Sequence, residues 1–261
     1  MTGRERRQTI TTILKKRGSL RVTEMSERLG VSEVTLRKDL ATLEEMGVLE
    51  RTHGGAVLAD QTDVGGLLST RKRTASEAKQ SIARAARTLL NHGETIFVDS
   101  GSTCAELARL IVDMELRVVS NALDVLVLLA DRPGIALHAT GGAFRHHAGS
   151  FIGPDAEEVV GRMHFDHAFV GATGVAEDGR FSSQNSIEAQ LKRRVIASAS
   201  TSVILADATK FGRNAFSEFS TMSDIDILIT DSATDRETVA QFRAHGLDVI
   251  VAEVLIPQHN S

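Results

Sequence analysis

Apolar positions in the first 45 residues recur at the three- and four-residue spacing of amphipathic helices. The pattern predicts a helix near residues 4–17, a short helix capped by Thr23 and closed by Gly30, and a third helix that begins at Ser32. The residues that define the three apolar faces are Ile10, Ile13, Leu14, Val22, Met25, Leu29, Leu36, Leu40 and Leu43. Two short helices, a tight turn and a third helix are typical of a helix-turn-helix.

Two short runs of β-type residues follow this pattern, within residues 48–58, and Gly54-Gly55 separates them. They predict a hairpin, which after a helix-turn-helix is the wing of a winged helix. The alternative is a plain helical bundle with a surface hairpin. The order of helices, turn, basic face and wing favours the winged helix.

From residue 77 onward, apolar runs of strand length alternate with stretches at helical spacing. The predicted strands cover residues 95–99, 117–120, 135–139, 167–170, 202–206, 225–230 and 248–251. The predicted helices cover residues 77–90, 104–111, 122–130, 154–161, 187–199 and 234–244. This alternation is typical of an α/β fold with a mainly parallel sheet covered by helices on both faces. Residues 59–75 show no clear period, so we expect a linker between domains at 1–58 and 76–261.

Charge is distributed unevenly along the chain, whose formal net charge is −4. The first 40 residues hold ten Lys and Arg against five Asp and Glu, which leaves 20 against 29 in the rest of the 261 residues. A basic N-terminal segment followed by an acidic remainder favours a DNA-binding module joined to a second domain with another function.

The outward face of the third helix carries the groups that a DNA major groove accepts. If its leucines face the core, then Ser32, Glu33, Val34, Thr35, Arg37 and Lys38 point outward. Hydroxyls suit phosphates, Arg or Lys suits guanine, and an apolar tip suits a thymine methyl. The candidate DNA-binding residues are Thr23, Ser32, Glu33, Val34, Thr35, Arg37, Lys38, and, beside the hairpin, Arg51 and His53.

Composition narrows the class of protein further. The chain is 42% hydrophobic and 25% charged, has no apolar run long enough to span a bilayer, and begins with a charged segment unlike a signal peptide. Its single cysteine, Cys104, cannot form an internal disulfide. We therefore expect a soluble cytoplasmic protein.

The loop Asp99 to Thr103 follows a predicted strand and opens a helix, which is where open α/β sheets bind ligands. Gly101 allows a tight turn, Ser102 and Thr103 add hydroxyls, and the helix N-terminus offers free amides, so the loop is suited to a phosphate. A loop of this kind is about as often a simple helix cap as a ligand-binding site. It lacks the Gly-Lys-Ser/Thr ending of a P-loop.

Other predicted strands also end in polar residues or glycines: Ser120-Asn121, Gly141-Gly142, residues 171–174 and residues 207–212. Each has a structural explanation by itself, and together they predict one pocket for a phosphate and several hydroxyls. Lys192 lies in a helical run with Arg193 and Arg194, and a run of charges usually marks a solvated face.

The segment Val31 to Leu40, with Leu43-Glu44 and the run Arg51 to Ala56, resembles the N-terminal signature of DeoR-family regulators. That family usually carries Ile and Arg where this chain has Leu36 and Lys38, and Lys cannot copy a bidentate Arg contact. The resemblance covers residues 4–58 and, more diffusely, residues 76–252.

The resemblance implies a repressor that binds double-stranded operator DNA, forms a homo-oligomer and responds to a phosphorylated sugar. Its sensor domain is then similar in fold to ribose-5-phosphate isomerases. The implied effector contacts are Asp99, Ser100, Gly101, Ser102, Thr103, Asn121, Gly141, Gly142, Glu188, Lys192, Asp207 and Lys210. No cofactor is implied.

The rival hypothesis is a sugar-phosphate isomerase with an accessory DNA-binding-like domain. Such an enzyme needs a carboxylate base, and in the isomerases acidic residues follow a Gly-Ala pair after the central strand. Here Gly171-Ala172 precedes Thr173-Gly174, and a Lys-Arg or Arg-Arg pair within residues 192–194 occupies the position of a Glu-Lys pair. A permanent cation cannot abstract a proton. Glu188 remains as a carboxylate one helical turn earlier, so one acidic group is still present. We favour an enzyme-like fold that retained ligand binding and lost catalytic activity.

Two further hypotheses involve metal and redox chemistry. The histidines His138, His146, His147, His164 and His167 lack a recognised ligand spacing, so we expect no metal site. Cys104 stands near a helix N-terminus, where thiol pKa values fall, but without a resolving cysteine we expect it to be a packing residue.

Overall fold

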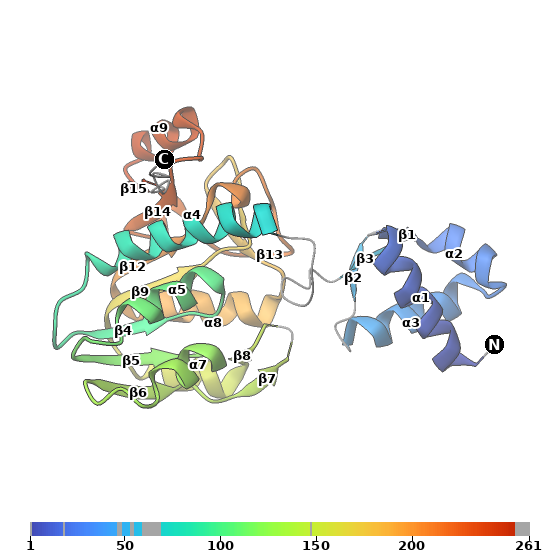
Figure 1. Ribbon diagram of the computed structural model, residues 1–261, viewed down its shortest axis with the longest axis horizontal. Coiled ribbons are helices and arrows are strands. Elements are labelled where there is room, and N and C mark those ends of the chain that lie inside the picture. The colour runs from blue at the N-terminus through green and yellow to red at the C-terminus, as the bar shows by residue number, and fades with distance from the viewer. Residues whose placement is uncertain are drawn as a thin grey trace, which may run out of the picture. The chain divides into compact units, whose positions relative to one another are not determined.

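A computed structural model describes residues 2–17, 19–45, 49–52, 55–58, 69–146 and 148–253. The chain divides into two compact units, residues 1–67 and residues 68–261 (Figure 1). Each unit has its own hydrophobic core, so each is described by itself.

The first unit is a winged helix. Its elements are α1 (Gly3–Arg17), β1 (Ser19–Arg21), α2 (Val22–Leu29), α3 (Glu33–Glu45), β2 (Leu49–Thr52) and β3 (Gly55–Leu58). The strands form an antiparallel sheet in the order β1-β3-β2. The predicted apolar faces of the helices meet in one core, to which Ile10, Met25 and Leu36 contribute fully buried side chains. This confirms the helix-turn-helix and its hairpin.

Two details of the first unit differ from the prediction. Thr23 does not cap α2: the chain passes directly from β1 into the helix, so the extended Arg21 takes the cap position and Thr23 lies exposed inside the helix. Gly55 lies in β3 and not in the turn. A side chain there would meet the carbonyl oxygen of Leu20 at 1.9 Å, so the pairing of β1 with β3 requires glycine at this position. The predicted caps Gly30, with φ +64°, and Ser32, whose Oγ accepts from the Thr35 amide at 3.2 Å, are both confirmed.

A buried carboxylate joins the first helix of this unit to the third. Asp39 of α3 accepts from Arg6 and, at 3.2 Å, from Arg7 Nη1, both on α1. The Asp39 side chain is almost fully enclosed, whereas the two arginines keep part of their surface in water. The ion pairs therefore fix α3 against α1 from the side opposite to its exposed residues.

The second unit is built on a seven-stranded sheet in the order β15-β14-β12-β9-β4-β5-β6, and every pairing between neighbours is parallel. Its strands are β4 (Thr95–Val98), β5 (Leu116–Ser120), β6 (Ile135–Ala139), β9 (Phe165–Gly171), β12 (Ala199–Leu205), β14 (Ile227–Asp231) and β15 (Asp248–Ala252). All seven coincide with predicted strands to within a few residues.

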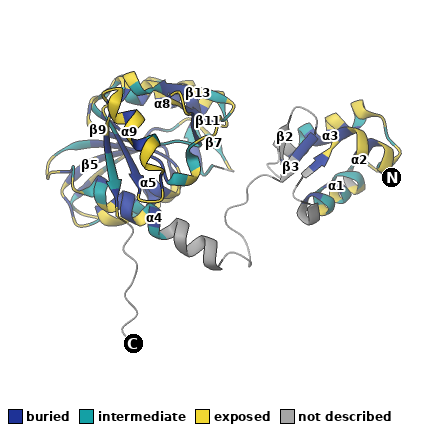
Figure 2. Cartoon of the chain, turned by 90° about the horizontal axis from the view of Figure 1, so that it is seen from above, coloured by how far each residue is buried: buried dark blue, intermediate teal, exposed yellow. Residues whose placement is uncertain are grey.

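Helices cover both faces of this sheet, because the strand residues alternate between two cores. Ile96 and Val98 of β4 pack on one face, and Phe97 packs on the other. The first face carries α4 (Ser69–Arg87), α5 (Ser102–Leu110) and α6 (Leu123–Leu129), and the second carries α7 (Pro154–Gly161), α8 (Ser186–Ala197) and α9 (Arg236–Ala244). Figure 2 shows the strands buried and the outer faces of the helices exposed. The predicted α/β class is confirmed.

Several elements of the second unit were not predicted. They are the hairpin of β7 (Ala143–Arg145) and β8 (Ser150–Ile152), and a small antiparallel sheet of β10 (Gly174–Val175), β11 (Arg180–Ser183) and β13 (Ser217–Thr221). Each of these strands is only two to five residues long, which is too short for an apolar period to mark it. Helix α4 begins at Ser69, inside the segment expected to be a linker. Among the described helices none is both long and apolar enough to cross a bilayer.

Candidate functional site

The connections of the large sheet diverge at β4. The chain proceeds from β4 to β5 and β6 on one side, and then returns to β9 on the other side of β4. Such a switch point leaves a crevice beyond the carboxyl ends of the two strands, and open α/β sheets bind ligands there. Asp99 follows β4 and Gly171 ends β9, so both stand at this crevice, where the Gly171 amide donates to Asp99 Oδ2 at 3.1 Å.

The side chain of Lys192, in α8, also lies at the carboxyl ends of β4 and β9. Its Nζ lies 3.0 Å from Asp99 Oδ2 and 3.2 Å from Glu188 Oε1, and it donates to the Gly171 carbonyl oxygen at 2.6 Å. Glu188 and Lys192 are one helical turn apart and both face inward, and only 4% of the Lys192 surface is exposed. The expectation of a solvated charge run is therefore wrong for Lys192, although it holds for Arg193 and Arg194, which are exposed.

The pKa of Lys192 is raised above its ordinary value. Burial by itself lowers that pKa, but the negative charges and hydrogen bonds of Asp99 and Glu188 outweigh it. Lys192 is therefore a fixed cation at neutral pH, and it cannot act there as a base.

The predicted phosphate loop lies directly beside this cluster. Gly101, with φ +120°, takes the cap position of α5, where a residue with a side chain would be strained. Because glycine has no side chain to cap the helix, the first amides of α5 remain available to an anion. Gly101 and Ser102 are exposed, whereas Ser100 and Thr103 are buried.

The other predicted effector contacts lie after the strands β5, β6 and β12. Asn121 follows β5, the strand next to β4, and its side chain is 1% exposed. Gly142 has a structural role, because a side chain on it would meet the Ile152 carbonyl oxygen at 2.6 Å. Asp207 follows β12 and accepts from the Thr209 amide at 3.0 Å, which caps a short 3₁₀ turn that includes Lys210. Asp207 and Lys210 thus stand one strand further from β4 than Gly171 does.

Most of the candidate DNA-binding residues lie at the start or on the exposed face of α3, and Thr23 lies exposed in α2. Val34 is 78% exposed, Lys38 is exposed, and Arg37 Nη2 pairs with Glu33 Oε2 at 3.3 Å. The hydroxyls of Ser32 and Thr35 lie 2.9 Å apart at the start of the helix. Arg51 belongs to β2, but its side chain and the whole of His53 lie outside the described residues.

Family models match both units: a DeoR-like helix-turn-helix domain matches residues 6–62, and a DeoR C terminal sensor domain matches residues 74–232. The chain belongs to the DeoR family. The lactose phosphotransferase system repressor of Streptococcus mutans is 35% identical over 238 residues, which cover 90% of this chain and 94% of that protein. The regulator GolR of Listeria innocua is 32% identical and covers 95% and 98%, and the L-fucose operon activator of Haemophilus influenzae is 30% identical and covers 83% and 87%.

Solved structures give weaker matches. Ribose 5-phosphate isomerase A of Methanocaldococcus jannaschii aligns with a TM-score of 0.38 at 20% identity, covering 51% of this chain and 53% of that one. The eIF2B delta subunit of Chaetomium thermophilum aligns with a TM-score of 0.45 at 15% identity, covering 59% and 56%. Scores this low support no argument about activity. The DeoR-family chain is a transcriptional regulator and not an enzyme, because the relatives that match most of its length are named as regulators.

Sequence reasoning missed Arg145 as a residue of this DeoR-family sensor unit. Its Nη1 lies 2.9 Å from Glu188 Oε2, so the β7–β8 hairpin is joined to the Lys192 cluster. The two residues are 43 positions apart, and Arg145 stands in a polar stretch without a period, so nothing local marks the pairing.

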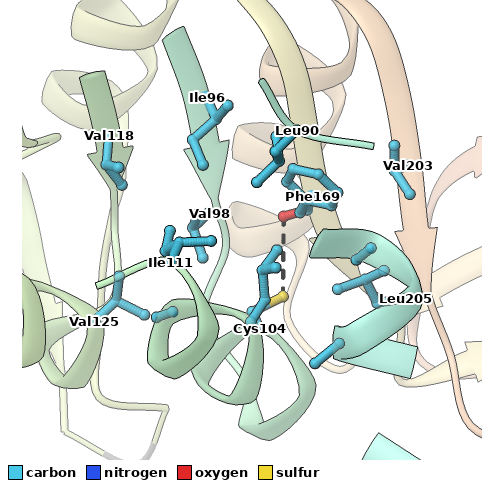
Figure 3. Packing of buried hydrophobic residues seen from close by; sticks show 14 of the residues in the cluster. Leu90, Ile96, Val98, Cys104, Ile111, Val118, Val125, Phe169, Val203 and Leu205 are labelled. Atoms are coloured by element: carbon cyan, nitrogen blue, oxygen red, sulfur yellow. Dashed lines mark hydrogen bonds between the residues drawn. The ribbon is translucent and has the colours of Figure 1, made fainter. Parts of the chain in front are cut away.

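Cys104 lies in the first turn of α5, and its side chain belongs to the apolar core. Figure 3 shows its sulfur among Val98, Ile111 and Phe169, and Sγ lies 3.9 Å from the Phe169 carbonyl oxygen. Burial, and then the nearby charge of Asp99, raise the pKa of the Cys104 thiol. The helix N-terminus therefore does not activate this thiol, which supports packing as its role. Within the described ranges, no three His, Cys, Asp or Glu side chains are grouped as metal ligands.

Proposed function

We propose that this protein is a repressor of a carbohydrate-metabolism operon, and that a phosphorylated sugar controls its affinity for operator DNA. The observation that carries the proposal is the buried Asp99–Lys192–Glu188 cluster at the carboxyl end of β4, next to the loop Ser100 to Thr103. The names of the S. mutans and H. influenzae relatives support a link to sugar operons. We propose repression and not activation, because the S. mutans relative is named a repressor.

DNA is bound by the first unit, with α3 in the major groove and the β2–β3 hairpin as the wing. Lys38 and Arg37 contact guanine or phosphate, and Val34 contacts a thymine methyl. Glu33 holds Arg37 in the free protein, and because the pair is exposed it costs little to break. Thr23, Ser32 and Thr35, together with Arg51 and His53 of the hairpin region, are proposed as contacts to the DNA backbone. A homo-oligomer places two such units on repeated half-sites.

The effector is bound by the second unit, within residues 76–261. Its phosphate lies against Ser100 to Thr103, where the amides of α5 and the hydroxyls donate to it. Asp99 and Asn121 bind hydroxyls, and Lys192, which also pairs with Glu188, holds the Asp99 side chain in place. Gly141 and Gly142 after β6 and the pair Asp207 and Lys210 after β12 complete the proposed contacts. The ligand binds one arrangement of the oligomer more tightly than the other, and so shifts the population away from the DNA-binding form.

Operator binding at fixed salt tests this proposal. Fragments of the promoter next to the protein's own gene are titrated with the full chain, alone and with glucose 6-phosphate, fructose 6-phosphate, ribose 5-phosphate and the matching free sugars. Salt is held constant because phosphate contacts make DNA affinity steeply dependent on ionic strength. We expect one phosphate ester to weaken operator binding by about 5- to 150-fold, the usual range of allosteric coupling, and its free sugar to have no effect. If the protein binds operator DNA and a broader panel of sugar phosphates never changes that affinity, the proposal is wrong.

A further inference from the structure

Four charged side chains form a continuous series of ion pairs from the β7–β8 hairpin to the end of β4. Arg145 Nη1 lies 2.9 Å from Glu188 Oε2, the other carboxylate oxygen of Glu188 lies 3.2 Å from Lys192 Nζ, and Lys192 Nζ lies 3.0 Å from Asp99 Oδ2. The exposed fraction of the side chain is 29% for Arg145 and falls to 12% for Glu188, 5% for Lys192 and 1% for Asp99. The series therefore runs from the partly hydrated hairpin into the interior.

The formal charges of these four side chains sum to zero. Lys192 supplies one positive charge against the two carboxylates of Asp99 and Glu188, both of which raise the pKa of Lys192. Arg145 supplies the second positive charge, and without it the cluster would carry a formal net charge of −1. Such an imbalance acts over a longer range in the interior than at the surface, because water and salt screen buried charges less.

The loop Ser100 to Thr103 lies next to this cluster. Asp99 immediately precedes the loop, and Lys192 donates to the Gly171 carbonyl oxygen at 2.6 Å. A side chain on Gly171 would lie 3.4 Å from the Ser100 carbonyl oxygen and 3.8 Å from Asp99 Oδ2, so the loop packs against the end of β9. A phosphate monoester carries a charge of about −1.5 to −2 at neutral pH, and an uncompensated carboxylate beside the loop would repel it.

We propose that Arg145 is a positioning residue of the effector site that acts through Glu188. By compensating the second carboxylate of the cluster, it allows an anionic ligand to bind at Ser100 to Thr103. The inference rests on the proposed function and adds Arg145, a residue of the β7–β8 hairpin, to it. The effect requires no contact between Arg145 and the ligand, and it acts on phosphorylated sugars and not on free ones.

A charge cycle on Arg145 and Glu188 tests this role. Arg145→Met, Glu188→Gln and the double variant are compared with the wild type as full-length chains. Calorimetric titration with glucose 6-phosphate, fructose 6-phosphate, ribose 5-phosphate and the matching free sugars measures the affinities. Thermal unfolding without ligand is recorded for each variant, so that lost affinity is not mistaken for a lost fold.

Arg162→Met is the matched control, because it removes the same charge from the same unit. Arg162 pairs with Glu158 at the exposed end of α7. It lies before the amino end of β9, whereas the cluster lies at the carboxyl end of that strand, about 20 Å away for a strand of this length. An exposed charge at that distance is largely screened.

We expect Arg145→Met to bind the preferred sugar phosphate roughly tenfold more weakly, and Glu188→Gln to bind it at least as tightly as the wild type. The double variant restores the charge balance, so its affinity should return to within about threefold of the wild type, and Arg162→Met should stay within about twofold. A purely structural pair behaves differently: its two single variants lose the same contact, and the double variant stays as weak as either.

If Arg145→Met binds the sugar phosphate as the wild type does, or if the double variant binds it as weakly as Arg145→Met, the charge role is wrong and the proposed function still stands. Weaker binding by Glu188→Gln would also overturn the charge role, since Glu188 would then contact the ligand itself. If the wild type binds none of the sugar phosphates, both proposals fail.

Discussion

Lys192 determines the electrostatics of the sensor unit at the level of single residues. The buried ammonium group is held by two carboxylates and one carbonyl oxygen, next to the loop Ser100 to Thr103. Because the folded pKa of Lys192 is raised, its stabilising charge is fully present below the unfolded pKa and is lost only as the pH rises through the higher folded value. Its contribution to stability therefore does not vary across the neutral range.

Replacing Lys192 leaves two buried carboxylates without a counter-charge. We expect Lys192→Met to lower the free energy of unfolding of the sensor unit by about 3–5 kcal/mol, as for other broken buried ion pairs. Gln190→Met, on the exposed side of the same helix, should change it by less than about 0.5 kcal/mol. Urea unfolding of the two full-length variants provides the comparison, and equal stabilities would show that the cluster does not hold the unit together.

The Cys104 thiol should be inert in the folded protein. Its raised pKa keeps it protonated at neutral pH, and only the thiolate reacts readily. We expect iodoacetamide at pH 7 to leave the native chain unmodified for hours and to label it fully in urea, with mass spectrometry as the readout. Rapid labelling of the native protein, accompanied by a change in operator affinity, would favour a redox-sensing cysteine.

At the scale of elements, the orientation of α3 depends on a residue on its inner face. Asp39 joins α3 to α1 through Arg6 and Arg7, while Glu33 of the same helix makes only an exposed pair with Arg37. Both are carboxylates on one helix, and they differ in burial, which makes them a matched pair for mutation.

We expect Asp39→Asn to lower the unfolding free energy of the first unit by about 1–3 kcal/mol and to weaken operator binding, because the buried carboxylate is lost and α3 is held less firmly. Glu33→Gln should cost less than about 0.5 kcal/mol, since an exposed pair at this spacing contributes little. Thermal unfolding and operator titration of the full chain measure both effects. A larger stability loss in Glu33→Gln than in Asp39→Asn would contradict this assignment.

The sequence predicts an element well when the element carries a long apolar period. The seven parallel strands and the leucine face of α3 were found this way, and the position of Asp99 followed from the end of its strand. The strands β7, β8, β10, β11 and β13 were missed because each is only two to five residues long, too short to show a period. Arg145 and the burial of Lys192 were missed because they depend on contacts between distant segments, such as the ion pair over 43 residues.

At the scale of the whole molecule, the chain joins two units with different tasks. The basic residues concentrate in the first 40 positions, and the polar strand ends concentrate in the second unit. The DeoR family models match the same two regions. The central claim is that operator DNA is bound by one unit and the phosphorylated effector by the other.

A crossed comparison of two variants tests this claim most directly. Operator affinity and sugar-phosphate affinity are both measured for full-length Lys38→Ala and Thr103→Val, at one salt concentration. Lys38→Ala removes one cationic contact, so we expect operator affinity to fall by about tenfold and ligand affinity to stay within about twofold of the wild type. Thr103→Val removes a hydroxyl of the phosphate loop without changing its size, so we expect the reverse. If both variants lose both affinities to the same extent, the two units do not divide the work and the account is wrong.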